Sequence, residues 1–256
     1  MNILAVGDVV GECGCDFLQK MLPKIKKEYN IDFCIVNGEN SAVGNGITQS
    51  SARHIFSVGA DVITTGNHVF RKKEIYDYLD EEENILRPAN MHWHEYGRGY
   101  VRVDMGRESV TVINIMGKAF FENIDDPFAE IDKILEEVQG DKNIIVDLHA
   151  EATGEKRALG FYLDGRISAL FGTHTHVQTS DETVLPRGTG YITDVGMTGA
   201  EESCLGVKKE CVIEKLRTGE NIKFEQATGK AILGGCVFTL DSCGKCTKVQ
   251  RILIKE

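Results

Sequence analysis

Short apolar runs alternate along the chain with longer amphipathic stretches. The runs are rich in β-branched residues and end in small or polar residues, a pattern typical of strands that are buried on both faces of a sheet. They lie at Ile3–Val6, Phe33–Val36, Val62–Ile63, Ile144–Val146 and Ala169–Phe171.

Between these runs, apolar residues recur at helical spacing, as Phe17, Met21 and Ile25 do. Thr48 stands at a favourable helix-capping position, and Pro127 stands where a first helical turn begins. The alternation of strand and helix predicts a layered α/β fold. The predicted helices span Phe17–Glu28, Thr48–Val58, Lys72–Leu79 and Pro127–Val138.

A second group of strands shows alternation or short connecting turns, which favours hairpins and antiparallel pairing. We therefore expect a layered mixed β-sheet sandwich flanked by helices. No Pro/Gly/Ser-rich linker divides the 256 residues, so residues 1–256 are predicted to form a single domain. The strands of this group span Tyr100–Asp104, Ser109–Ile115, Thr189–Thr193, Ala231–Leu240 and Thr247–Ile254.

Composition narrows the functional class. Lys+Arg is 29 and Asp+Glu is 39, giving a formal net charge of −10, which argues against a sequence-independent nucleic-acid coat protein. A nucleotide substrate stays open, because a local metal ion can outweigh the global charge. No apolar run approaches the roughly 20 residues of a membrane helix. The N-terminus, Met1–Asp8, has no basic region or cleavage site, so we expect a cytoplasmic protein with no membrane partner.

The 8 cysteines are expected to be reduced thiols, since a chain of this size without a secretion signal has no need of disulfides. Cys243 and Cys246 form a lone CxxC, whereas a zinc ribbon needs two such pairs. Glycines inside this pair and inside Cys13-Gly14-Cys15 indicate turns.

The candidate chemistry lies at the ends of five predicted strands, where ligand sites gather in layered α/β folds. Each polar group at a strand end is by itself weak evidence for a metal site, because a lone Asp after a strand usually caps a turn. His174-x-His176 is stronger, since alternate residues of an extended segment point the same way. Capping does not readily explain why five strand ends all carry oxygen or nitrogen ligands. The candidate metal ligands are Asp8, Glu39, Asn40, Asn67, His149, His174 and His176.

Carboxylate, amide and imidazole ligands without a thiolate suit Mn, Fe, Zn, Co or Ni. Seven ligands are too many for one tetrahedral ion and enough for two ions with a shared carboxylate, the arrangement used for phosphoester hydrolysis. The remaining histidines do not follow strands: His54 falls in a predicted helix, and His92 and His94 flank Trp93.

In their order and context these motifs resemble the calcineurin-like metallophosphoesterases, and more closely the narrower group of YmdB-like 2′,3′-cyclic nucleotide phosphodiesterases. The departures from the broad pattern fit the narrower group: Val10 replaces the His of the first motif, Val69 follows His68, and Thr173 precedes the last His-x-His. The matching stretches cover nearly the whole chain, at residues 7–11, 37–40, 65–68, 87–90, 147–153, 172–179 and 194–199.

The resemblance implies a role for each residue. One metal ion would be held by Asp8, Asn40 and His176, and the other by Asn67, His149 and His174. Glu39 would bridge the ions, which are iron or manganese in the first place, with zinc as a further candidate. A hydroxide between the metals would attack a 2′,3′-cyclic nucleotide while His68, as general acid, protonates the departing ribose oxygen. The resemblance also implies a homo-oligomer and RNA fragments as further partners.

Two other functions stay open on the sequence. One is a metal-dependent phosphomonoesterase or nucleotidase with the same ligands. The other is a metal-stabilised regulatory scaffold without turnover, against which the intact His68 argues, because a structural metal site needs no adjacent acid. Near the motifs, Arg71–Lys73 fits a solvated helix start better than a phosphate contact, and Glu151 and Thr153 fit either contacts behind the ligands or a helix cap.

Overall fold

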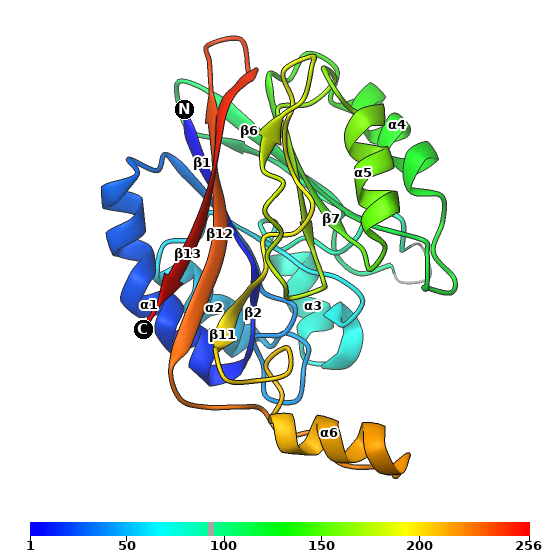
Figure 1. The fold of residues 1–256 in the computed structure, drawn as a ribbon. Helices are drawn as coiled ribbons and strands as arrows, with labels where there is room; N and C mark the ends of the chain where they lie inside the picture. Colours follow the sequence, from blue (N-terminus) through cyan, green and yellow to red (C-terminus); the bar gives the residue numbers. More distant parts are fainter. Residues whose placement is uncertain (92–94) are drawn as a thin grey trace.

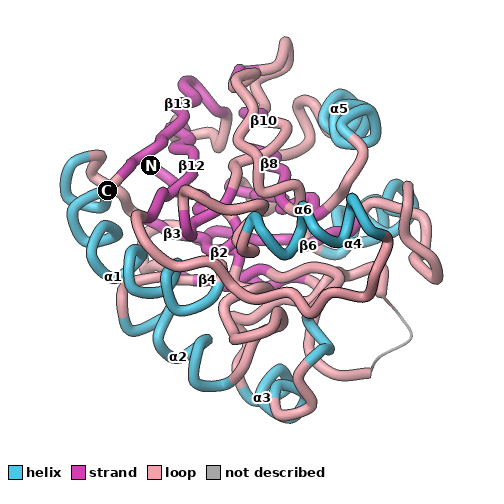
Figure 2. Tube along the Cα trace, turned by 60° about the horizontal axis from the view of Figure 1, so that its bottom comes forward, coloured by secondary structure: helices cyan, strands magenta, loops and turns pink. Residues whose placement is uncertain are grey.

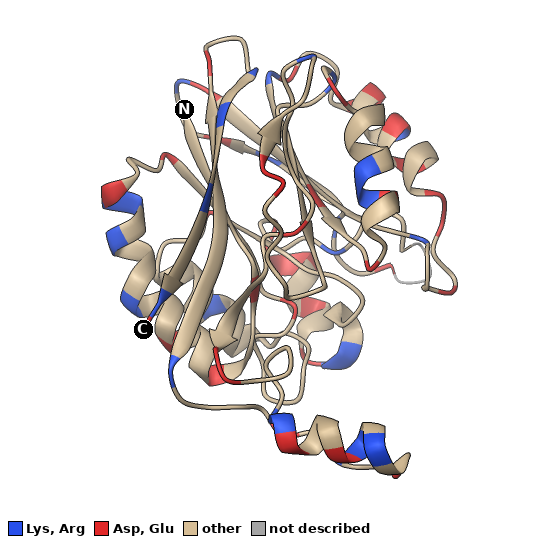
Figure 3. Cartoon of the chain, in the orientation of Figure 1, with Lys and Arg blue, Asp and Glu red and all other residues tan. Residues whose placement is uncertain are grey.

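The computed structural model describes residues 1–91 and 95–256. Two mixed β-sheets pack face to face, and helices cover both outer faces (Figure 1). This confirms the predicted α/β sandwich. In a view turned by 60°, most of the strands lie between the helices (Figure 2). Most charged residues lie on the outer helices and the loops (Figure 3).

The first sheet has the strand order β2-β11-β12-β1-β3-β4, with β13 beside β12. The strands β1, β3 and β4 run parallel, while β12 pairs antiparallel with β1. The bounds are β1 Asn2–Val6, β2 Asp8–Val9, β3 Phe33–Asn37, β4 Val62–Thr64, β11 Met197–Ala200, β12 Ala231–Leu240 and β13 Cys246–Lys255.

The second sheet has the order β5-β6-β7-β8-β10-β9. Its central strands are parallel, and its two edge strands are antiparallel to their neighbours. The bounds are β5 Tyr100–Asp104, β6 Ser109–Met116, β7 Asn143–His149, β8 Ala169–Thr173, β9 Thr183–Val184 and β10 Gly190–Ile192.

Both faces of the central strands are buried, which explains their near-continuous apolar sequences. In β1, Ile3 and Ala5 face the second sheet, whereas Leu4 and Val6 pack beneath helices. The outer face of the first sheet is covered by α1 Gly11–Glu28, α2 Gln49–Ser57 and α3 Ile75–Glu81, and that of the second by α4 Pro127–Glu137 and α5 Thr153–Tyr162.

Thr48 is the N-cap of α2, as predicted, and its hydroxyl accepts a hydrogen bond from the Ser51 amide at 3.1 Å. Helix α1 begins at Gly11, earlier than the predicted start at Phe17. Cys13 and Cys15 therefore lie in α1, and their predicted turn is wrong. Gly14 serves close packing, since a Cβ there would lie 2.3 Å from the Thr198 carbonyl oxygen.

The turn at Cys243 is confirmed, with Gly244 at φ +82°. All eight cysteines carry free thiols. Two helices had no predicted counterpart, α5 and α6 Lys209–Thr218; α6 projects from the sandwich and buries none of its residues (Figure 1). A short 3₁₀ helix, η1 Val69–Arg71, precedes α3.

His54 lies in α2, as expected, with Nε2 3.3 Å from the Cys15 carbonyl oxygen. His92 and His94 fall outside the described residues. Within residues 1–91 and 95–256, no helix combines the length and apolar character that crossing a membrane requires. The single domain, the cytoplasmic location and the homo-oligomer remain predictions.

Candidate metal centre

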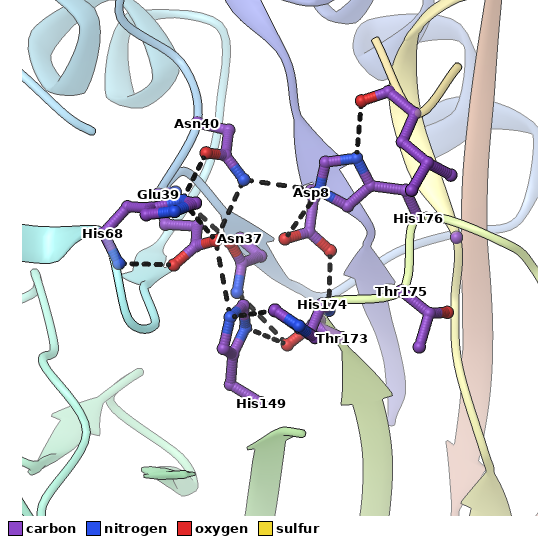
Figure 4. A network of polar contacts seen from close by, with 12 residues as sticks. Asp8, Asn37, Glu39, Asn40, His68, His149, Thr173, His174, Thr175 and His176 are labelled. Carbon is purple, nitrogen blue, oxygen red and sulfur yellow. Dashed lines mark hydrogen bonds and ion pairs between the residues drawn. The ribbon is translucent and has the colours of Figure 1, made fainter. Parts of the chain in front are cut away.

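All seven predicted ligands meet where the parallel strands of the two sheets end. Figure 4 labels six of them, and Asn67 lies against His149. Strands β1, β3 and β4 of the first sheet lead to Asp8, to the Glu39-Asn40 pair and to Asn67. In the second sheet, β7 ends at His149 and β8 leads to His174 and His176. The carboxyl ends of parallel strands share one edge of their sheet, which is why residues so distant in sequence come together.

One group of donors surrounds Asp8, which is completely buried. Within residues 1–91 and 95–256, its Oδ1 atom has no hydrogen-bond partner, and it lies 3.6 Å from Nε2 of His176. The other ring nitrogen of His176, Nδ1, lies 3.0 Å from the Leu205 carbonyl oxygen. Because a carbonyl only accepts, Nδ1 carries a proton and Nε2 is turned toward Asp8.

The second group converges on Nε2 of His149. This atom lies 3.0 Å from Oδ1 of Asn67, 3.1 Å from Nδ1 of His174 and 3.4 Å from Oε1 of Glu39. One ring nitrogen cannot bond to three such neighbours at once. Two ligands that each lie about 2.1 Å from one metal ion are about 3.0–3.4 Å apart, so the donor spacing fits a shared cation.

The proton position on His149 follows from Thr173. The Thr173 hydroxyl donates its one hydrogen to Asp147 at 2.7 Å. It can therefore only accept from Nδ1 of His149, which lies 2.9 Å away. This keeps a proton on Nδ1, so Nε2 is the nitrogen that a metal ion would bind.

Glu39 lies between the two groups. Its Oε1 accepts from the Asn40 amide at 2.9 Å, and its Oε2 accepts from the backbone N–H of His68 at 3.2 Å. Burial raises the pKa of Glu39, but the charge of His149 and further hydrogen bonds outweigh it and hold the pKa well below its usual range. The carboxylate is therefore ionised, and a buried negative charge is stable only with positive charge nearby.

The pKa values of two histidines shift in opposite directions. Burial lowers the pKa of His176, but the negative charge of Asp8 outweighs burial and raises that pKa to about 9. Burial and the charge of His149 lower the pKa of His174 to about 4. Buried carboxylates that attract positive charge, beside three imidazoles, form a donor set that fits metal ions.

His68 stands beside these donors at the edge of the cleft. Its Nδ1 lies 2.9 Å from Oδ1 of Asn40 and 3.4 Å from Oε1 of Glu39. Among the described residues, Nε2 of His68 has no hydrogen-bond partner. The amide of Asn40 is oriented with Nδ2, and not its oxygen, toward Glu39 and toward His176 at 3.3 Å.

His174 and His176 both lie at the site, as predicted, but they do not lie on an extended segment as the prediction assumed. Strand β8 ends at Thr173, and His174 and His176 have φ values of +99° and +64°, so the segment is not extended. The two rings point to different groups of donors, His174 to His149 and His176 to Asp8. Positive φ at two such residues is backbone strain, which concentrates at functional sites.

Gly66 allows the two sheets to approach each other here. A Cβ on Gly66 would lie 2.2 Å from the His149 ring and 2.4 Å from Oε2 of Glu39. Only a residue without a side chain fits between these donors.

A cleft of about 240 Å³ opens over the donors. It is lined by Glu39, His68 and His174, and also by Leu205 and Gln226. The opening gives a small molecule access to both groups of donors.

Sequence reasoning gave no role to several residues that support the site: Asn37, Thr64, Asp147, Thr173 and Leu205. Asp147 accepts from Asn37 at 3.1 Å as well as from Thr64 and Thr173. The signal was present, because an Asp in an otherwise apolar buried strand has to have partners. Glu151 lies 3.0 Å from Nε2 of His174, so it is a contact of a candidate ligand and not a helix cap.

Comparison with known proteins gives matches over the full chain. Its sequence is 45% identical over 258 residues to the 2′,3′-cyclic-nucleotide 2′-phosphodiesterase of Bacillus subtilis (strain 168), covering 100% of this chain and 98% of that protein. A hypothetical protein from Thermus thermophilus has a crystal structure with a TM-score of 0.94 and 40% identity, with both chains fully covered. The crystal structure of a phosphatase from Mycoplasma pneumoniae has a TM-score of 0.94 and 30% sequence identity to this chain. The match covers 100% of this chain and 93% of that protein.

A family model described as YmdB-like protein matches residues 4–252. Since that match spans nearly every element of both sheets, the chain belongs to the YmdB-like family, as its sequence motifs implied.

Proposed function

We propose that this protein hydrolyses 2′,3′-cyclic nucleotides with two metal ions, opening the 2′ ester bond to leave a nucleoside 3′-phosphate. The name of the Bacillus subtilis relative supplies the reaction. The observation that carries the proposal is the pair of donor groups on either side of Glu39, in one cleft with His68.

Asp8, Asn40 and His176 would hold one ion, and Asn67, His149 and His174 the other, with Glu39 between them. When bound, two such cations supply positive charge that offsets the charge developing on phosphate and makes water a better nucleophile near neutral pH. Oδ1 of Asp8 accepts no hydrogen bond from any described residue, and this supports the assignment, because a buried carboxylate oxygen without a donor is otherwise costly. Iron and manganese are the proposed metals, and zinc has the same ligand preferences.

As a ligand, Asn40 would present Oδ1, so its amide has to turn over from the orientation described above. His68 lies beside this amide, and its Nε2 is the nitrogen without a hydrogen-bond partner in the described part of the chain. We assign His68, in its protonated imidazolium form, as the general acid on this ground. Nε2–H is placed to deliver a proton to the leaving oxygen, and its loss leaves a neutral imidazole.

The test is turnover of 2′,3′-cyclic AMP by the purified chain reconstituted with Mn²⁺ or Fe²⁺, with products separated by chromatography. We expect adenosine 3′-monophosphate. Faster cleavage of p-nitrophenyl phosphate than of bis-p-nitrophenyl phosphate would instead indicate the phosphomonoesterase. No hydrolysis of any of these substrates by metal-loaded protein would favour the scaffold without turnover.

The remaining assignments belong to the same proposal. We place residues 1–256 in one domain, because the layer between the two sheets draws residues from both halves of the chain. A cytoplasmic homo-oligomer acting on a small phosphodiester, or on RNA fragments that end in a cyclic phosphate, completes the proposal.

A further inference from the structure

A fully buried ion pair lies behind the candidate ligands of the second sheet. Lys156 of α5 and Asp194, after β10, both have 0% exposed side chains. Nζ of Lys156 lies 2.7 Å from Oδ2 of Asp194 and donates to the carbonyl oxygen of Thr173 at 2.8 Å. In many proteins the free energy lost on desolvating two buried charges exceeds the free energy gained from their attraction. Stability alone therefore does not explain this pair.

The same carboxylate holds the segment that carries the two histidines. Oδ2 of Asp194 accepts from the backbone N–H of Thr175 at 3.2 Å and from its hydroxyl at 2.8 Å. Oδ1 accepts from the backbone N–H of Gly196 at 2.8 Å. The residues on either side of His174, Thr173 and Thr175, are thereby both fixed.

This segment needs such restraint because His174 and His176 are both at positive φ. A non-glycine residue in this region of backbone space is strained and persists only where its surroundings hold it there. If the segment relaxed, both imidazoles would swing away from His149 and Asp8, since each ring direction follows its backbone.

We propose that Lys156, Asp194 and Thr175 form a clamp whose role is to position His174 and His176 for metal binding. The three are positioning residues and touch neither substrate nor metal. The inference rests on the proposed function, because it assigns the two histidines to metal ions. It adds a means by which α5 and the loop after β10 control the affinity of the site.

The sharpest variant is Thr175→Val, which removes one hydroxyl and keeps the shape of the side chain. We expect Mn²⁺, titrated by calorimetry, to bind about 10–100-fold more weakly, the range found when groups behind metal ligands are lost. The melting temperature of the metal-free protein should change little, because the Thr175 backbone N–H still reaches Asp194. Thr175→Ser keeps the hydroxyl and should restore the affinity.

A second variant tests the ion pair without leaving an uncompensated buried charge that would unfold the protein. Lys156→Met alone leaves a buried carboxylate uncompensated, so Lys156→Met is combined with Asp194→Asn, which removes both charges and keeps the volumes. The double variant should fold and bind Mn²⁺ more weakly than the native chain.

Native affinity in Thr175→Val and in the double variant would overturn the clamp while the proposed function stands. A loss of affinity that Thr175→Ser fails to restore, or that matches a fall in metal-free melting temperature, would show a merely structural role. A native chain that binds no Mn²⁺ or Fe²⁺ would overturn both proposals.

Discussion

Nε2 of His149, the last residue of β7, lies 3.0 Å from Oδ1 of Asn67, which follows β4. The two atoms belong to segments of different sheets, and both are donors of the candidate site. A cation bound here would therefore tie the sheets together at the edge where their parallel strands end.

Removal of metal should lower stability. An ion that binds the folded chain at about 100 times its dissociation constant adds about 2.7 kcal/mol, which for a chain of this size corresponds to about 5–10 °C in melting temperature. Thermal unfolding followed by circular dichroism, before and after dialysis against a chelator, measures this shift. Added Mn²⁺ should reverse it, and equal midpoints in all three states would contradict a folded-state metal site.

His68→Ala should reduce turnover of a cyclic nucleotide by about 10²–10⁴-fold, because the departing ribose oxygen loses its proton donor. The metal content should remain native, since His68 holds no ion in the proposed arrangement. Bis-p-nitrophenyl phosphate, whose leaving group needs little protonation, serves as the control substrate and should be affected much less. Loss of metal from this variant would refute the assigned role.

Gly66→Ala should abolish metal binding, because the added methyl group would lie 2.2 Å from the His149 ring. Gly154→Ala is the matched control: it lies in α5, and its added Cβ would meet no described atom within 4 Å apart from its chain neighbours and its own helix backbone. That change should leave metal binding intact and stabilise the helix by up to about 1 kcal/mol. Elemental analysis of both purified variants checks the contrast, and a Gly66→Ala protein with native metal content would show that the sheets can separate.

Thr173→Val should weaken metal binding about 10–100-fold, because His149 loses the acceptor that keeps the proton on Nδ1. It should also lower the free energy of unfolding by about 1–3 kcal/mol, since buried Asp147 loses a donor. Calorimetric titration and urea denaturation report the two effects separately. Thr173→Ser keeps the hydroxyl, so any equal loss in that variant would remove the hydrogen bond as the explanation.

The sequence was sufficient for the layers of the fold and for the candidate ligands. Buried parallel strands have near-continuous apolar sequences, and a polar residue directly after such a strand is conspicuous, as Asp8 and His149 are. The start of α1 was harder, because Gly11 and Gly14 disfavour a helix in isolation and are accepted for their close packing against neighbouring segments.

The support behind the ligands could not be predicted in the same way. Lys156 sits in α5 among ordinary helix-forming residues, and nothing in its neighbourhood indicates that it is fully buried against Asp194. The sequence gives no sign of the positive φ of His174 and His176 either, because this backbone conformation depends on hydrogen bonds from residues distant in the chain. Side-chain networks of high sequence separation are defined by the tertiary structure alone.

In the proposed site, two metal ions share one cleft, on either side of Glu39. Anomalous diffraction at the manganese edge from crystals grown with Mn²⁺ would locate these ions. Two peaks per chain are expected, one among Asp8, Asn40 and His176 and the other among Asn67, His149 and His174. A single peak, or none at these residues, would contradict the proposed site.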